Sequence, residues 1–360
     1  MNKIWNDFAI GSIKLEHRLA LAPMTRLRAL PDGTPSDLAV EYYKQRASLG
    51  LLISEGTQPS KIGQGYVGSP GIYAPEHIQG WSKVAEAVHQ QNAHLFIQLM
   101  HAGRVSHPSI LNGELPVAPS AIATPQEIFT AEGPQSAPVP RALETAEIND
   151  VQNEFVQAAK NAIQAGADGI EIHGANGYLL WQFLNTNSNQ RTDAYGGSIE
   201  NRARMHLEVA RKIAQEIGAD KTGIRLSPNM NFLGMHEDED WKDVYRYLIM
   251  ELEKLSLAYV HLFYFGDDEF LAEIRSILKN TPLLLVKAGR DIQSIEKDLE
   301  NGIADIFPIA TMAVSNPDIV ERLKNGQALT APNPDTFYAG GADGYIDYLN
   351  RTGFVGESIF

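Results

Sequence analysis

Eight short apolar runs, separated by longer amphipathic stretches, constrain the fold of this chain more than any other feature of its sequence. Most of the runs are rich in Ile, Leu and Val and alternate little with polar residues, a pattern typical of buried parallel strands. They span residues 19–24, 51–54, 95–99, 169–172, 222–226, 259–263, 283–286 and 305–309. Strands that alternate with helices along a chain predict a parallel sheet covered by helices.

The stretches between the runs carry the spacing of amphipathic helices. Residues 81–91 and 148–165 place apolar side chains three or four positions apart, as a helix with one buried face does. Gly166 follows the second stretch directly, at the position of a helix C-terminal cap. The same pattern returns in residues 201–217 and 241–255. These four stretches are therefore predicted to be helices.

Eight strands alternating with helices predict a TIM (β/α)8 barrel that forms a single domain over residues 1–360. A doubly wound open sheet is the competing fold, but it should show a G-x-G-x-x-G turn after an early strand, and the sequence has none. Residues 104–146 are too long for a simple connection, so we expect a cap or lid over the barrel mouth after the third strand. Residues 327–360 form an aromatic, glycine-rich tail that we expect to pack on the barrel.

Composition and charge disfavour or exclude several classes of function. The net charge of −14 disfavours binding to nucleic acid or to an anionic membrane surface. The absence of cysteine excludes disulfides, thiolate nucleophiles, Cys-ligated zinc and iron–sulfur clusters. The N-terminus lacks the apolar core of a signal peptide, and no stretch approaches the roughly 20 apolar residues that span a bilayer. We therefore expect a cytoplasmic monomer or homodimer that acts on a small molecule, without a nucleic-acid or membrane partner.

Polar side chains follow the fourth apolar run, where a barrel of this kind places its active site. His173 and Asn176 can both donate a hydrogen bond to one oxygen atom, whether the imidazole is neutral or charged. Two such donors would stabilise negative charge that builds on a carbonyl or nitro oxygen. Tyr178 has an ordinary pKa of about 10, so it is a candidate proton donor at neutral pH. The alternative is a structural turn with a satisfied histidine and a packed tyrosine.

Three other strand ends carry candidate binding residues. Gln98 can donate and accept at once, which suits the edge of a planar heterocycle, although it could also tie down a loop. Arg225, at the end of a buried run, needs an anion or an electron-rich partner, and a structural salt bridge would also meet that need. Thr25 follows the first run, where a short hydroxyl is more often a structural cap than a ligand contact.

Taken together, these segments resemble the old yellow enzyme family of flavin-dependent ene-reductases. The resemblance covers nearly the whole chain in the family's order. It rests on APMTR at 22–26, VEYYKQRAS at 40–48, QLMHAGRVSHPS at 98–109, HGANGYLLWQFL at 173–184, SNQRTDAYGGSIENRAR at 188–204, RLSP at 225–228 and FYAGGADGYIDY at 337–348. The resemblance implies an NAD(P)H-dependent oxidoreductase that holds FMN non-covalently over the mouth of a (β/α)8 barrel.

The resemblance also implies which residues contact the flavin ring. Gln98 would bind its pyrimidine edge, and Arg225 would sit near N1 and O2, where a cation favours the anionic reduced flavin. The hydroxyl of Thr25 would lie near the C4 carbonyl. The matching positions along the ring are Pro23, Met24, Thr25 and Gly56.

On the substrate side, the resemblance implies that His173 and Asn176 bind the substrate's oxygen. Tyr178 would protonate the carbon next to the activating group. The implied mechanism is ping-pong: NADPH or NADH reduces the flavin at N5 and leaves, and an α,β-unsaturated carbonyl or nitro compound then accepts the hydride at its β-carbon. Aromatic and apolar side chains expected to line the pocket are Tyr66, Met100 and Tyr338.

The chain departs from the family pattern in its pocket. Met100 stands where members usually have Trp, which exchanges a rigid wall for a flexible one. Leu233 lies near the position of a polar Gln in related members, so the pocket is expected to be less polar there.

A further departure affects the grip on the FMN phosphate. Members typically use two adjacent glycines after the seventh strand and Gly–Arg after the eighth. This chain has Ala288–Gly289–Arg290 and then Ala310–Thr311. We expect Arg290, with the backbone of Gly289 and Thr311, to hold the phosphate, and Lys287 is another cation nearby. The competing hypothesis is a flavin-free barrel that binds an unsaturated or phenolic ligand as a sensor or carrier.

Overall fold

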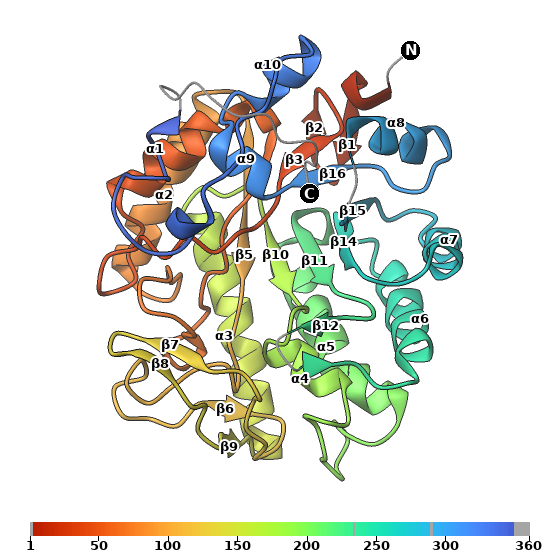
Figure 1. The fold of residues 1–360 in the computed structure, drawn as a ribbon. Helices are drawn as coiled ribbons and strands as arrows, with labels where there is room; N and C mark the ends of the chain where they lie inside the picture. The colour runs from red at the N-terminus through yellow and green to blue at the C-terminus, as the bar shows by residue number, and fades with distance from the viewer. Residues whose placement is uncertain (1–2, 233–234, 289–290, 349–360) are drawn as a thin grey trace.

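The computed structural model describes residues 3–232, 235–288 and 291–348, and its centre is an eight-stranded parallel sheet (Figure 1). The strands, in their order around the sheet, are β15 (Leu283–Lys287), β14 (Tyr259–Tyr264), β11 (Thr222–Leu226), β10 (Gly169–His173), β5 (His94–Leu99), β4 (Leu51–Ile53), β3 (Leu19–Leu21) and β16 (Phe307–Ile309). A parallel bridge between Leu284 and Ile306 joins the two ends of the sheet. The predicted (β/α)8 barrel is confirmed, and each of the eight apolar runs overlaps one of its strands.

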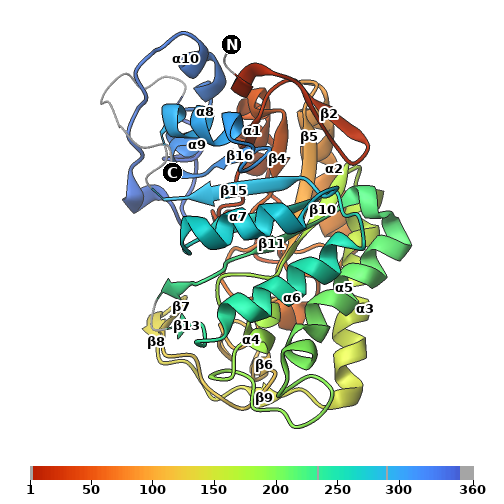
Figure 2. The ribbon, with the colours of Figure 1, turned by 90° about the vertical axis from the view of Figure 1, so that its right-hand side faces the viewer.

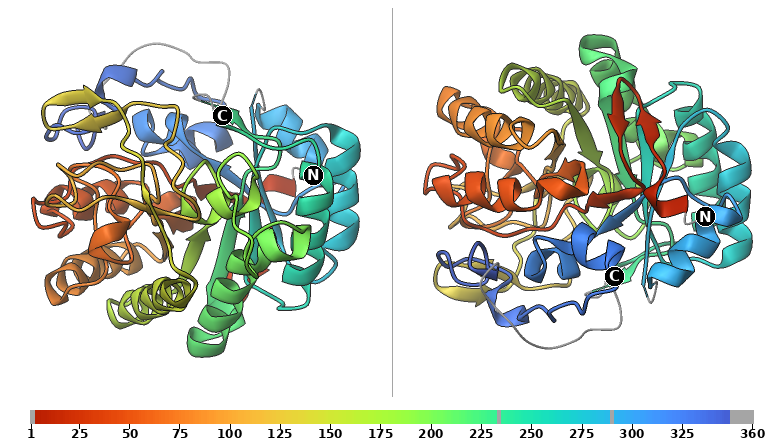
Figure 3. Two further views of the ribbon diagram at one scale, coloured as in Figure 1. Left: turned by 90° about the horizontal axis from the view of Figure 1, so that it is seen from below. Right: turned by 90° about the horizontal axis from the view of Figure 1, so that it is seen from above.

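Helices form a ring outside the strands (Figure 3). They are α1 (Asp37–Gln45), α2 (Pro75–His89), α3 (Thr145–Gln164), α4 (Leu179–Leu184), α5 (Ile199–Ile217), α6 (Trp241–Glu253), α7 (Asp268–Ile277), α8 (Ile292–Glu300), α9 (Thr311–Ser315) and α10 (Ile319–Lys324). The four predicted helices coincide with α2, α3, α5 and α6. Each buries one apolar face against the strands, and α5 begins where the Ser198 side chain accepts a hydrogen bond from the Asn201 backbone N–H.

A hairpin that precedes the first barrel strand closes the amino-terminal end of the barrel. It consists of β1 (Phe8–Ile10) and β2 (Ile13–Leu15), and it lies across the end of the barrel seen from above in Figure 3. Its buried residues Ile10, Ile13 and Leu15 pack with apolar side chains from the barrel strands. The opposite end, at the carboxyl ends of the strands, is where barrels of this kind carry their active sites.

The insertion at residues 104–146 lies at that opposite end (Figures 1 and 2). It contains the parallel pair β6 (Val117–Ala118) and β9 (Arg141–Ala142) and the hairpin of β7 (Ile128–Thr130) and β8 (Gly133–Gln135). Ile128 is buried with Val105 and Ile110, and this small cluster packs on Tyr66 and Tyr178. A further hairpin, β12 (Asn231–Phe232) with β13 (Met235–His236), follows β11.

Buried arginines fasten the tail, as far as residue 348, to the loop after β3. The Nε of Arg26 donates to the Phe337 carbonyl at 2.9 Å, and another of its nitrogens donates to the Gly344 carbonyl at 2.8 Å. Arg28 donates to the Gly341 carbonyl at 2.9 Å. A guanidinium carries five N–H donors in a fixed plane, which suits the scattered carbonyls of an irregular segment. The tail is therefore held by directional contacts rather than by secondary structure.

Replacing Arg26 with Lys should lower the free energy of unfolding by about 1.5–3 kcal/mol, because one ammonium cannot reach the separate carbonyls of Phe337 and Gly344. Urea denaturation followed by circular dichroism measures this change. The matched control is Arg211→Lys at an exposed position of α5, which should change stability by less than about 0.5 kcal/mol. Equal stability of the two variants would contradict this account of the tail.

Candidate active site

Three of the predicted site residues lie at the carboxyl ends of neighbouring strands. His173 of β10 is the register partner of Arg225 of β11, and Gln98 of β5 is paired with Glu171, two residues before His173. Gln98 is only 2% exposed and Arg225 only 8% exposed. Parallel register therefore brings together side chains that are separated by 127 residues of sequence, from Gln98 to Arg225.

The turn between β10 and α4 positions Asn176 and Tyr178. Asn176 and Gly177 both have positive φ, 57° and 84°, and a Cβ on Gly177 would lie 2.5 Å from the Met235 side chain. Asparagine and glycine tolerate this backbone conformation better than other residues do. The Asn176 N–H donates to Ser227 Oγ at 2.9 Å, which ties the turn to the loop after β11. The Gly177 carbonyl accepts from Gln182 at 2.8 Å.

His173 is a neutral imidazole with a buried, unused nitrogen. It is 4% exposed, and its Nδ1 has no hydrogen-bond partner among the described residues. Burial, and next the charge of Arg225, hold the pKa of His173 well below its usual value of about 6.5. The sequence left both protonation states open, and the structure favours the neutral form, which can donate one hydrogen bond.

Tyr178 is paired with a second tyrosine from the loop after β4. Its hydroxyl lies 2.8 Å from that of Tyr66, and the two rings are nearly perpendicular at 85°. The Tyr178 ring centroid is 5.2 Å from that of His173. Burial raises the pKa of Tyr178 well above its ordinary value, so its phenol stays protonated. A neutral hydrogen-bond donor and a protonated phenol thus lie side by side.

The loop after β3 carries Pro23, Met24 and Thr25 to the same end of the barrel. The Pro23 carbonyl lies 3.5 Å from a terminal nitrogen of Arg225, a marginal hydrogen bond. Met24 and Thr25 are half-buried. Tyr338, on the tail, is 59% exposed, and its neighbour Ala339 donates its N–H to the Arg26 carbonyl at 3.0 Å. The tail therefore brings Tyr338 beside the loop after β3.

The side chain of Met100 packs directly against Gly56. A Cβ added to Gly56 would lie 2.6 Å from the Sδ of Met100, and the Met100 side chain is buried. A flexible thioether thus fills the space beside Gly56. Any larger residue at position 56 would displace it.

The sequence model of the NADH:flavin oxidoreductase / NADH oxidase family matches residues 3–330. The chain belongs to this family. A probable flavin mononucleotide-dependent alkene reductase of Leishmania infantum is 40% identical over 94% of this chain and 95% of its own. The old yellow enzyme homologue from Zymomonas mobilis superposes with a TM-score of 0.92 at 34% identity, covering 96% of this chain and 99% of that chain. Morphinone reductase in complex with tetrahydroNAD gives a TM-score of 0.90 at 39% identity, covering 96% of both chains.

These findings confirm the resemblance to old yellow enzymes and the predicted activity at the level of the family: FMN-dependent ene-reduction driven by a nicotinamide dinucleotide. The residues present also fit a flavin. Arg225 is a buried cation whose Nε has no hydrogen-bond partner among the described residues. Its guanidinium also makes a marginal contact with the Pro23 carbonyl at 3.5 Å and lies over the Phe263 ring, 5.2 Å from the centroid. An electron-rich ligand edge would satisfy it.

The phosphate end of the site is only partly described. Gly289 and Arg290, expected to hold the FMN phosphate, lie outside the described residues, as does Leu233. Thr311 is half-buried at the first position of α9. Lys287, the other candidate cation, is paired with Asp268. The predicted grip by Arg290 thus stays a prediction, and the nearby lysine already has a carboxylate partner.

Glu171 and His261 are two buried ionisable residues that the sequence interpretation missed. Glu171 is 0% exposed, accepts a hydrogen bond from Gln98 Nε2 at 2.7 Å, and lies 2.8 Å from His261 Nδ1. Both residues interrupt apolar strands, in GIEIH and YVHLFY. An ionisable residue inside such a run was the signal that could have found them.

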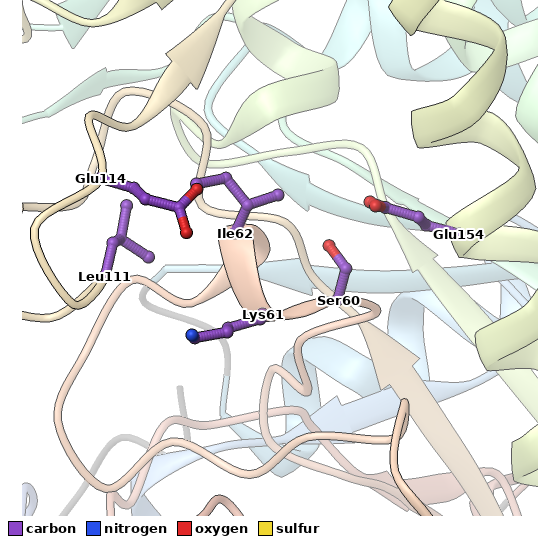
Figure 4. A pocket seen from close by; sticks show the side chains of 6 residues that line it. All are labelled: Ser60, Lys61, Ile62, Leu111, Glu114 and Glu154. Atoms are coloured by element: carbon purple, nitrogen blue, oxygen red, sulfur yellow. The ribbon is translucent and has the colours of Figure 1, made fainter.

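A separate cavity of about 210 Å³ lies beside the loop before Tyr66 (Figure 4). None of the predicted site residues lines it. Its walls are Ser60, Lys61, Ile62, Leu111, Glu114 and Glu154. Burial raises the pKa of Glu154 in this cavity. We assign the chemistry to the strand ends, where the neutral donors and the unsatisfied cation lie, and not to this cavity.

The pKa shifts of His173 and Tyr178 predict a flat pH profile for alkene reduction. Both groups remain neutral between about pH 6 and about pH 9, since burial moves one pKa down and the other up. The rate of flavin reoxidation by an enone, followed by stopped-flow absorbance, should be nearly constant over that range. A titration with an apparent pKa near about 6.5 would show instead that His173 ionises in the ordinary range.

Proposed function

We propose that the protein reduces activated C=C bonds of α,β-unsaturated carbonyl or nitro compounds at the strand ends, with Tyr178 as the proton donor. One observation carries the proposal: the neutral imidazole of His173 and the protonated phenol of Tyr178 share one turn, 5.2 Å apart between ring centroids. They lie next to Arg225, the register partner of His173. Oxygen binding, proton donation and flavin binding are thereby concentrated at one edge of the sheet.

FMN would be held along its ring by residues of two strands, β5 and β11, and of the loops after β3 and β4. Gln98 and Arg225 would bind the polar edge of the ring, and the hydroxyl of Thr25 would contact its carbonyl side. When bound, FMN supplies the hydride, which it takes from NADPH or NADH. The remaining ring contacts are assigned to Pro23, Met24 and Gly56.

His173 and Asn176 would orient the substrate by donating hydrogen bonds to its carbonyl or nitro oxygen. Negative charge on that oxygen increases as the β-carbon accepts hydride, so donors fixed in place by the turn stabilise the transition state more than the substrate. Tyr178 then transfers its phenolic proton to the α-carbon. Tyr66, within hydrogen-bond distance, would donate to the phenolate oxygen that this transfer leaves.

The substrate pocket would be formed by Tyr66, Met100 and Tyr338 together with the capping insertion. Ile128 and its buried neighbours place an apolar wall against Tyr66 and Tyr178. Such a wall favours substrates that carry an apolar body beside the activating group. The thioether of Met100 would adjust to bodies of different shape.

We also infer where the protein acts and with what kind of partner. Within the ranges that the structure describes, every helix is too short or too polar to cross a membrane. The electron donors NADPH and NADH are supplied inside cells, which supports a cytoplasmic location. The charge of −14 is consistent with a small-molecule partner and opposes nucleic-acid binding. We infer a single domain because the strands of one sheet extend from residue 19 to residue 309. A monomer or homodimer stays a prediction.

Replacing Tyr178 with Phe should slow alkene reduction by about 10²–10⁴-fold, because the proton donor is removed while the ring remains. Flavin reduction by the nicotinamide donor should be almost unchanged. Stopped-flow measurement of the two half-reactions separates these effects, with Tyr247→Phe on α6 as the matched control. Equal slowing of both half-reactions would argue against a dedicated proton donor.

Replacing Arg290 with Ala should weaken FMN binding by about 10–100-fold if its guanidinium grips the phosphate, since a charge-assisted contact is worth about 1.5–3 kcal/mol. Lys287→Ala is the matched control, because Lys287 is already paired with Asp268. Fluorescence titration of apoprotein with FMN and with riboflavin gives the affinities, and only the FMN affinity should fall. A larger loss for the lysine variant would move the phosphate grip to Lys287.

A further inference from the structure

A buried carboxylate lies beside Gln98 and, along the strands, two residues before the level of Arg225. Glu171, in the middle of β10, reaches toward β5 on one side and toward β14 on the other. Gly223 of β11 is its register partner and has no side chain to obstruct the path to His261. A Cβ at Gly223 would lie 2.4 Å from the Tyr259 ring. Side chains from two other strands, β5 and β14, thus converge on one carboxylate of β10.

Glu171 is ionised in this environment. Burial by itself would raise its pKa, but His261, Arg225 and the hydrogen bond from Gln98 together hold that pKa below its usual range. An ionised carboxylate only accepts hydrogen bonds. Its partners must therefore donate: the amide nitrogen of Gln98 at 2.7 Å and the Nδ1–H of His261 at 2.8 Å.

This requirement fixes the orientation of the Gln98 amide. With one N–H of its NH₂ group donated to Glu171, Gln98 turns its carbonyl oxygen away from the carboxylate, where it can accept a hydrogen bond. A carbonyl oxygen accepts a hydrogen bond from an N–H group, which the pyrimidine edge of a flavin carries. A flipped amide would instead put its carbonyl against an anion, which is repulsive.

We propose that Glu171 is a positioning residue of the flavin site: it holds Gln98 in the orientation that accepts from the flavin N–H, and its charge offsets that of Arg225. The inference rests on the proposed function only through FMN binding. Removing the negative charge should leave Arg225 less compensated, which favours an anionic reduced flavin. Removing the acceptor should free the Gln98 amide to flip.

Two substitutions separate these effects. Glu171→Gln removes the charge and can hydrogen-bond to either orientation of Gln98. FMN should then bind about tenfold more weakly, the equivalent of one hydrogen bond, and the flavin midpoint potential should rise. Glu171→Asp keeps the charge but is one methylene too short to reach both partners, so affinity should fall while the potential stays near the wild-type value.

Glu208→Gln is the matched control. Glu208 also accepts a hydrogen bond from a glutamine amide, that of Gln152 at 2.7 Å, but it lies on α5 outside the barrel. It should change neither FMN affinity nor potential. Fluorescence titration gives the affinity, and reduction against a dye of known potential gives the midpoint.

The measured FMN affinities and potentials of these variants distinguish a positioning role of Glu171 from a purely structural one. Wild-type affinity and potential in both Glu171 variants would overturn the positioning role. If Glu171→Gln fails to fold, Glu171→Asp carries the test alone, and unchanged FMN affinity in that variant would also overturn the role.

A double variant that combines a Glu171 substitution with Gln98→Leu should bind FMN no more weakly than Gln98→Leu alone, because Glu171 acts through Gln98. If the unsubstituted protein itself does not bind FMN, the proposed function fails rather than this inference.

Discussion

The guanidinium of Arg225, buried near the end of β11, needs electron-rich partners. The described residues satisfy only some of its N–H groups, and its Nε has no hydrogen-bond partner among them. Arg225 has a marginal contact with the Pro23 carbonyl and the face of Phe263, while the carboxylate of Glu171 acts on it from the level below. An isolated buried cation would be costly, so the arrangement is stable because the compensating charge lies within the barrel. Because the described residues leave Arg225 short of hydrogen-bond acceptors at this end of the barrel, an electron-rich ring bound there would be favoured.

The loops around that site are held by a second set of buried charges. Glu55, after β4, accepts from the backbone N–H groups of Arg26 and Leu27 at 2.8 and 3.0 Å. Arg26 in turn fixes the tail that carries Tyr338. The Tyr345 ring stacks on Tyr42 of α1 with centroids 4.3 Å apart. Residues that would contact flavin and residues that would contact substrate therefore share one rigid support.

Sequence was sufficient for the barrel because buried parallel strands need apolar residues on both faces, and such runs are readable without knowledge of the contacts. It also identified His173, Asn176, Tyr178 and Arg225 as candidates, because polar residues within or shortly after such runs stand out; their roles stay predictions. The amino-terminal hairpin was missed, because its strands of three residues carry too little pattern to distinguish them from a loop.

Glu171 and His261 were missed for a different reason. Their side chains meet only because β10, β11 and β14 are adjacent in the closed sheet, and adjacency is a property of the fold rather than of any local segment. The hydrogen bond between Tyr66 and Tyr178 likewise depends on how two loops approach each other. A single sequence does not reveal which distant residues will be in contact. The residue types at the end of a strand, by contrast, can be identified from the local sequence.

Burial is the largest cause of the protonation states of both His173 and Tyr178. Removal from water penalises the imidazolium of His173 and the phenolate of Tyr178 alike, so one pKa falls and the other rises. Each group is then in its neutral, hydrogen-bearing form at neutral pH. The same dry environment strengthens the interactions of the charges of Arg225 and Glu171, which in the proposed complex would act on a flavin edge rather than on solvent. An acidic protein can therefore bind anionic cofactors, because the charge that they meet is local and buried.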